Sequence, residues 1–286
     1  MKRLIGWAGR AISYLLFVAP PFVRRWMGNV LAFLWFDLFR IRRHVVLENI
    51  SIAFPEISAR ERIHLARRSL QNLGLNIVEY SFFPFLSMGN LERFFEFHNP
   101  ELLERAFARG RGVLLLTLHL GNGDLAVAGL SVKGYPMVMV SKFFKLKWLN
   151  DLWFGMRERL GTRFIAPRNS SYSLLKSLRQ GAAVVIPLDQ FTGPPIGVRT
   201  TFFGKETGTG MGLAVMAERS QAPVISVYTR RTPEGRQAVH FVREMPFQGE
   251  SAEKVTQSFN DELERFVRLH PEQWMWIHRR WKRFKY

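Results

Sequence analysis

The sequence predicts an α/β fold: a mostly parallel central sheet flanked by helices, with apolar N-terminal helices that associate with a membrane. Beyond residue 100, short apolar segments alternate with segments of helical periodicity. This alternation is typical of strand–helix–strand units with a parallel sheet. The chain has 286 residues, of which 47% are hydrophobic, so it is long and apolar enough to bury a sizeable core.

After Arg43 the expected elements follow one another in one domain, without an internal repeat or a linker. Gly112–Leu118 is short, apolar and bounded by glycine, as expected of a buried strand. Ser58 and Glu61 form a capping-box pattern at the start of a helix. The other expected strands are Pro136–Val140, Thr162–Ile165, Ala182–Leu188 and Val224–Thr229, with Val239–Arg243 continuing the sheet. The expected helices are Ser58–Phe83, Leu102–Ala108, Leu125–Val132, Trp148–Leu160, Ser170–Leu178, Gly212–Arg219 and Ala252–Leu269.

The amino-terminal segment is apolar but interrupted. Ala11–Val23 and Trp26–Phe36 are mostly apolar, and each is shorter than the roughly 20 residues that span a bilayer. We expect helices that lie in the membrane interface, although one spanning helix over Leu4–Val23, or buried helices of a soluble core, remain alternatives. The predicted division is a membrane-associating helical segment, 1–40, followed by a catalytic domain, 41–286.

Composition favours anionic partners. The formal charge is +18, and the chain has 25 phenylalanines and eight tryptophans. A basic and aromatic surface is typical of proteins that bind an anionic membrane surface, and it would also suit an acidic carrier protein. We find no helix-turn-helix, zinc-finger or RNA-binding signature, so no nucleic acid is expected. With no cysteine, disulfides and a cysteine acyl intermediate are excluded.

The candidate catalytic centre is the turn from His119 to Asp124. His119 lies where an expected strand ends, and Asp124 lies at the start of the next helix. Gly121 and Gly123 permit a sharp turn that brings the two together. The carboxylate would then orient the imidazole, which accepts a proton on its other nitrogen. The structural alternative is that Asn122 or Asp124 caps the helix and His119 is a polar strand end.

Other catalytic motifs are absent from the sequence. There is no Gly-x-Ser-x-Gly elbow, phosphate-binding loop or dinucleotide fingerprint. The seven histidines show no metal-ligand spacing, so neither a metal nor a cofactor is expected.

His119–Asp124 resembles the H-x4-D/E motif of the lysophospholipid acyltransferase-like superfamily, and the wider pattern resembles the lipid A biosynthesis late acyltransferase family of the lauroyl/myristoyl type. The resemblance covers residues 40–285. Many members have Trp-Glu where this chain has Gly123 and Asp124. The matching blocks are Arg43 with Asn49–Glu56, His119–Asp124, Arg157 with Gly161, Asp189–Gln190 with Phe202–Gly204, and Pro271–Lys282.

The resemblance implies an enzyme at the cytoplasmic face of the bacterial inner membrane. It would transfer a fatty acyl group from an acyl carrier protein thioester, as co-substrate, to a hydroxyl of a lipid A precursor or related membrane lipid. Alternative acceptors are a lysophospholipid, an aminolipid and a glycolipid. The alternative of another class is a non-enzymatic basic protein that binds membranes or nucleic acid.

The resemblance also implies roles for single residues. His119 would be the general base, Asp124 would orient it, and Arg157 would stabilise the oxyanion, with Lys142 as a second choice. Arg157 as an exposed helix charge is the alternative.

Further substrate contacts are expected nearby. Asp189 and Gln190 end an expected strand and would line the same cleft, together with Asn122. Phe202 and Phe203 would form an acyl groove or, alternatively, a plain apolar hairpin. The C-terminal tryptophans would contact the membrane interface or the carrier: Trp274, Trp276 and Trp281.

Overall fold

A seven-stranded sheet forms the centre of the molecule. The computed structural model describes residues 2–167 and 170–284, so residues 1, 168–169 and 285–286 of the two predicted segments lie outside it. The strand order is β1-β9-β8-β2-β5-β3-β4. All neighbours are parallel except β8 and β9. The strands are β1 (Phe95–His98), β2 (Val113–Thr117), β3 (Met137–Val140), β4 (Arg163–Ile165), β5 (Ala183–Pro187), β8 (Val224–Arg231) and β9 (Gln237–Met245).

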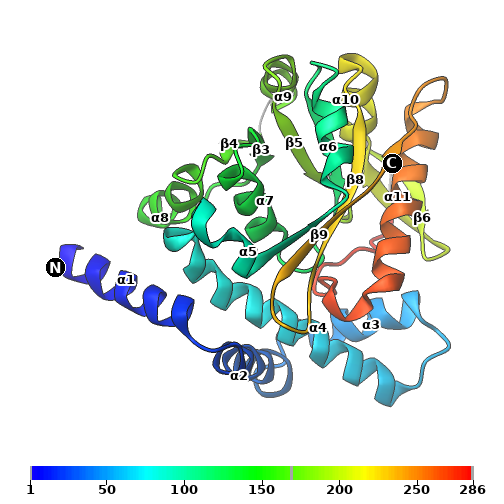
Figure 1. Ribbon diagram of the computed structural model, residues 1–286. Coiled ribbons are helices and arrows are strands. Elements are labelled where there is room, and N and C mark those ends of the chain that lie inside the picture. The colour runs from blue at the N-terminus through cyan, green and yellow to red at the C-terminus, as the bar shows by residue number, and fades with distance from the viewer. Residues whose placement is uncertain (1, 168–169, 285–286) are drawn as a thin grey trace.

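Helices cover both faces of this sheet, which confirms the predicted α/β fold (Figure 1). Leu114 and Leu116 of β2 face a cluster with α3, α4, α9, α10 and α11, whereas Val113 and Leu115 face α6 and α7. This alternation shows that β2 is buried on both sides. The helices are α3 (Arg43–Ala53), α4 (Ala59–Glu79), α5 (Leu91–Phe94), α6 (Pro100–Phe107), α7 (Gly123–Val132), α8 (Lys147–Glu158), α9 (Ser170–Arg179), α10 (Gly212–Ser220) and α11 (Ala252–Leu269).

Short elements complete the chain. β6 (Gly197–Phe202) and β7 (Lys205–Gly210) form an antiparallel hairpin that packs against α11. Neither strand was among the predicted elements. The remaining turns of helix are η1 (Phe33–Leu38), η2 (Tyr80–Phe85), η3 (Met88–Asn90) and η4 (Pro271–Gln273).

The N-terminal helices α1 (Lys2–Val18) and α2 (Pro21–Ala32) extend along one side of the molecule (Figure 1). α2 packs closely on α4, where the backbones of Gly28 and Gly74 approach each other. None of the helices within residues 2–167 and 170–284 is long and apolar enough to cross a bilayer. Large apolar side chains of this region are exposed nonetheless: Ile12, Leu15, Phe22, Trp26, Phe33 and Phe39.

Candidate active site

His119 and Asp189 lie side by side beyond the ends of two neighbouring strands. β2 and β5 are parallel, and their register pairs Thr117 with Pro187. His119 and Asp189 each stand two positions beyond a paired residue, so their side chains leave the same side of the sheet edge. The N–H of Leu188 donates to the Thr117 carbonyl at 3.0 Å, which continues the pairing toward the two side chains.

The Asp189 carboxylate accepts three hydrogen bonds. Oδ1 accepts from His119 Nδ1 at 2.8 Å, and Oδ2 accepts from the His119 backbone N–H at 3.0 Å and from Trp274 Nε1 at 2.7 Å. An ionised carboxylate only accepts, so Nδ1 carries the proton and Nε2 of a neutral imidazole is unprotonated. The side chain of Asp189 is only 3% exposed, whereas that of His119 is 35% exposed. Nε2 is therefore the basic nitrogen of a partly exposed ring, with the Gln190 amide nitrogen 3.5 Å away.

Charge within the pair shifts both pKa values. Burial alone would raise the pKa of Asp189, but the charge and hydrogen bond of His119 and the hydrogen bond of Trp274 lower it to about 2. Burial alone would lower the pKa of His119, but Asp189, by charge and hydrogen bond, and the charge of Asp124 together raise it above its usual value. Asp189 is therefore ionised at neutral pH, and His119 is a stronger base than a free imidazole.

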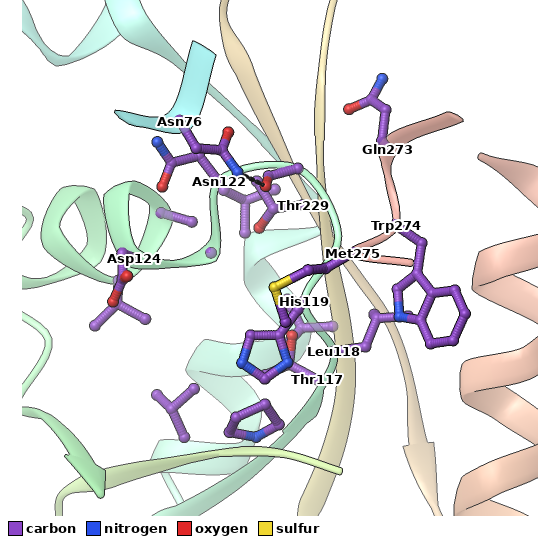
Figure 2. A pocket seen from close by; sticks show the side chains of 18 of the residues that line it. Asn76, Thr117, Leu118, His119, Asn122, Asp124, Thr229, Gln273, Trp274 and Met275 are labelled. Atoms are coloured by element: carbon purple, nitrogen blue, oxygen red, sulfur yellow. Dashed lines mark hydrogen bonds between the residues drawn. The ribbon is translucent and has the colours of Figure 1, made fainter. Parts of the chain in front are cut away.

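The carboxylate that orients the imidazole is thus not the one predicted. Asp124 accepts a hydrogen bond from the Tyr80 hydroxyl at 3.2 Å, and its Oδ1 lies 3.3 Å from Nη1 of Arg157. Asp124 belongs to the first turn of α7, where its side chain faces η2 and α8. Figure 2 shows it on the α7 side of the cavity, apart from the imidazole. Its influence on His119 is electrostatic.

Arg157 is buried beside Asp124, so the alternative of an exposed helix charge is wrong. Its guanidinium carbon lies 4.1 Å from the ring centre of Trp153 and 5.4 Å from that of Phe83. Nε and Nη2 find no hydrogen-bond partner within the described parts of the chain. Buried donors without a partner are unfavourable unless a ligand accepts from them. Its predicted role as oxyanion donor stays a prediction.

Asn122 is buried and engaged within the protein. Its side-chain oxygen accepts from the N–H of Leu125 at 3.1 Å and caps α7, which confirms the structural alternative for this residue. Its amide donates to Glu79 at 2.9 Å. Glu79 also accepts two hydrogen bonds from Arg231, at 2.9 and 2.6 Å, and one from Gln237 at 3.0 Å. This buried network holds the end of the His119–Asp124 turn.

The turn itself is pinned by a segment far away in sequence. Leu120 forms an isolated antiparallel bridge with Trp274, and the N–H of Met275 donates to the His119 carbonyl at 3.1 Å. Gly121 has a φ of +60°, and a Cβ there would lie 2.4 Å from the carbonyl oxygen of Thr229. Only glycine suits that position.

A cavity of about 150 Å³ opens beside this centre. His119, Asp124 and Asn122 lie along it (Figure 2). Its remaining wall, between α7 and the sheet, is mostly apolar and includes Leu115, Ala126, Val127, Leu130, Met139, Val185, Val227 and Val239. The described residues include no group of three or more histidines and carboxylates that could hold a metal. An apolar chain fits such a wall, and a polar reacting group fits its mouth.

The other predicted substrate contacts differ in how close they lie to His119. Gln190 is close, with Nε2 3.5 Å from His119 Nε2. Lys142 is exposed and is not part of the cavity wall. Phe202 and Phe203 are buried in the core instead of forming the expected groove, because Phe202 packs on Trp274 with ring centres 5.7 Å apart. The alternative of an apolar hairpin is confirmed for this pair.

The C-terminal tryptophans differ from the prediction as well. Trp274 and Trp276 are buried against each other, with ring centres 4.5 Å apart, so they contact neither a membrane nor a carrier. Trp281 is partly buried, and its indole N–H donates to the Phe202 carbonyl.

Residues 1–283 match the model of the family described as bacterial lipid A biosynthesis acyltransferase. The chain belongs to this family. It is 26% identical to the lipid A biosynthesis lauroyltransferase of Escherichia coli K12 over 282 residues, which covers 96% of this chain and 90% of the relative. It is 24% identical to the palmitoleoyltransferase of lipid A biosynthesis from the same organism, over 96% and 90% of the two chains. A lipid A biosynthesis acyltransferase of Haemophilus influenzae is 25% identical over 80% and 72%.

Family membership identifies an acyltransferase of lipid A biosynthesis and removes the non-enzymatic alternative. Within this acyltransferase, sequence reasoning missed the pairing of His119 with Asp189 and the contacts of Tyr80 and Trp274. The available signal was position, since His119 and Asp189 stand equally far beyond the ends of two strands expected to be parallel. Sequence alone did not show that these strands are neighbours.

Proposed function

We propose that this acyltransferase transfers a fatty acyl group from an acyl carrier protein thioester to a hydroxyl of a lipid A precursor, with His119 as the general base. The observation that carries the proposal is Nε2 of the partly exposed His119 ring at the mouth of an apolar cavity, with Nδ1 held by the buried Asp189. A hydroxyl placed there can lose its proton to Nε2.

The reaction is direct transfer. Nε2 takes the proton from the acceptor hydroxyl as its oxygen attacks the thioester carbonyl carbon. The tetrahedral intermediate collapses, the carbon–sulfur bond breaks, and the imidazolium returns the proton to the leaving sulfur, which yields the ester and a thiol. Asp189 stabilises the imidazolium in between. Arg157, whose Nε and Nη2 have no hydrogen-bond partner within the described residues, supplies donors for the oxyanion in this proposal, and Asp124 holds Arg157.

The cavity between α7 and the sheet accommodates the acyl chain in this proposal. Ala126, Val127 and Leu130 of α7 face it. Replacing Ala126 with Leu shortens the available space, so the preferred acyl chain becomes shorter. The measurement is a competition between donors of different chain length, with the exposed Ala59→Leu on α4 as the matched control.

His119→Ala tests the function directly. Loss of the base lowers acyl transfer by about 10²–10⁴-fold, while the protein still folds and still associates with vesicles. His64→Ala, at an exposed position of α4, is the control and keeps full activity. Normal transfer by the His119 variant would show that the base lies elsewhere.

The donor and the location belong to the same proposal. The net charge of +18 suits an acidic carrier and an anionic membrane, and the exposed apolar side chains of α1 and α2 suit the cytoplasmic face of the bacterial inner membrane. Apparent affinity for the carrier-bound donor then falls as ionic strength rises. A flat salt response argues against the acidic carrier. Mass spectrometry of lipids made with and without the enzyme distinguishes a lipid A precursor from a lysophospholipid, aminolipid or glycolipid acceptor.

A further inference from the structure

A second cleft, of about 550 Å³, lies between α2, α4 and the turn that joins β8 to β9. Five arginines line it: Arg24, Arg25, Arg68, Arg230 and Arg231. We name it the arginine cleft. It shares Asn72 and Gln273 with the wall of the active-site cavity, but no residue of the proposed acyl-transfer mechanism lines it.

The positive charges of the arginine cleft are poorly compensated. The charge of Arg231 is compensated by Glu79, to which Arg231 donates two hydrogen bonds. The other four arginines form no ion pair with any carboxylate of the described chain, and only one further carboxylate, Glu272, lines the cleft. Burial lowers the pKa of His270, so this imidazole adds no charge at neutral pH.

The individual contacts leave donors free. Arg25 gives one N–H to the Pro233 carbonyl at 2.8 Å, and Arg24 lies over the Phe82 ring at 5.1 Å. Burial lowers the pKa of Arg24, and neighbouring guanidinium charges add to this although Glu79 opposes it. Gathering like charges in one concave site is unfavourable unless an anion shares them. Guanidinium groups match the oxygens of a phosphate by paired hydrogen bonds.

We propose that the arginine cleft binds a phosphate group, of the monoester type that carries close to two negative charges. The position of the cleft favours a phosphate on a lipid. Phe22 and Trp26 are exposed on the same helix as Arg24 and Arg25, two positions before Arg24 and one position after Arg25. An apolar ridge beside a basic cleft suits a headgroup whose acyl chains lie in the membrane.

The test measures binding and needs no acyl transfer. The probes are neutral detergent micelles that contain either phosphatidic acid, a phosphate monoester, or diacylglycerol, its uncharged counterpart. The ratio of the two affinities removes the contribution of the apolar helices. The variant is Arg68→Gln with Arg230→Gln, two arginines that line the cleft and whose side chains form no hydrogen bond or ion pair within the described residues. The control removes the same charge elsewhere: Arg105→Gln with Arg179→Gln, both exposed.

The wild-type protein and the control prefer phosphatidic acid, and the double Gln variant loses at least about tenfold of that preference, which corresponds to about 1.4 kcal/mol. Arg68→Lys with Arg230→Lys keeps part of it, since the charge remains but the paired hydrogen bonds of a guanidinium are lost. If inorganic phosphate competes with phosphatidic acid at a similar concentration, the ligand is a free phosphate. If inorganic phosphate does not compete, the ligand is a lipid headgroup. Equal preference in the double Gln variant and the control overturns the proposal, provided that their thermal unfolding matches.

Discussion

Replacing Asp189 with Asn removes the negative charge of the His119–Asp189 pair and almost none of its volume. Asp189 accepts on Oδ1 from His119 Nδ1, and on Oδ2 from the His119 N–H and Trp274 Nε1. An asparagine has one accepting oxygen. It keeps two of the three bonds by placing that oxygen at the Oδ2 position, and its NH2 then faces Nδ1. Nδ1 must become the acceptor, which moves the imidazole proton to Nε2, where the reaction needs a base.

The expected consequence is a loss of kcat by about 10³–10⁴-fold, or about 4 to 5 kcal/mol of transition-state stabilisation. The assay is transfer of a labelled acyl group at saturating donor and acceptor, with thermal unfolding to confirm the fold. Asp151→Asn, at an exposed position of α8, is the control. A kcat of the Asp189 variant within threefold of wild type would refute the role of the pair.

The pH profile of the same variant gives a second readout. The base acts when neutral, so kcat/KM of the wild type rises with pH through the raised pKa of His119. Removing the Asp189 charge stabilises the neutral imidazole and lowers that pKa. The pH at which kcat/KM of the variant rises is therefore lower than that of the wild type. An unchanged pH of this rise contradicts the assignment of His119 as the base paired with Asp189.

Three further substitutions test the supports of the site. Glu79→Gln leaves the Arg231 guanidinium without its carboxylate in a buried network. The free energy of unfolding, measured with denaturant, therefore falls by about 3–5 kcal/mol. A fall of less than about 1 kcal/mol would show that the Glu79–Arg231 ion pair does not stabilise the fold. Gly121→Ala forces a Cβ to 2.4 Å from a carbonyl oxygen and destabilises the fold by at least about 2 kcal/mol. Gly123→Ala meets nothing within 4 Å and changes the free energy of unfolding by less than about 0.5 kcal/mol; similar losses at the two glycines would refute the steric account.

Much of the fold follows from local patterns. Ala252–Leu269 was predicted with the bounds that α11 has, and the structure shows that the Ser251 side chain caps its start. β6 and β7 were not predicted as strands, because contacts with α11 stabilise them: the Thr201 N–H donates to the Gln257 side chain at 2.8 Å, and the Thr201 carbonyl accepts from it at 3.1 Å. Such contacts join parts of the chain that no local pattern relates.

The candidate site, like the fold, was predictable only in part from the sequence. His119 and the cleft at the strand ends were predictable, since an apolar strand, a glycine turn and a helix follow one another along the chain. The choice between Asp124 and Asp189 was not predictable from spacing, because it depends on β5 lying beside β2. Burial of Trp274 and Phe202 was also hidden, since aromatic side chains suit a core as well as a membrane interface.

The bridge between Leu120 and Trp274 also has a consequence for biosynthesis. His119 leaves the ribosome long before Trp274 does, and until then its backbone carbonyl and Asp189 lack the partners that Met275 and the indole provide. A nascent chain that has already formed β2 and β5 therefore carries the catalytic residues without their final geometry. The geometry of the His119–Asp189 pair is complete only when the C-terminal segment has folded against it.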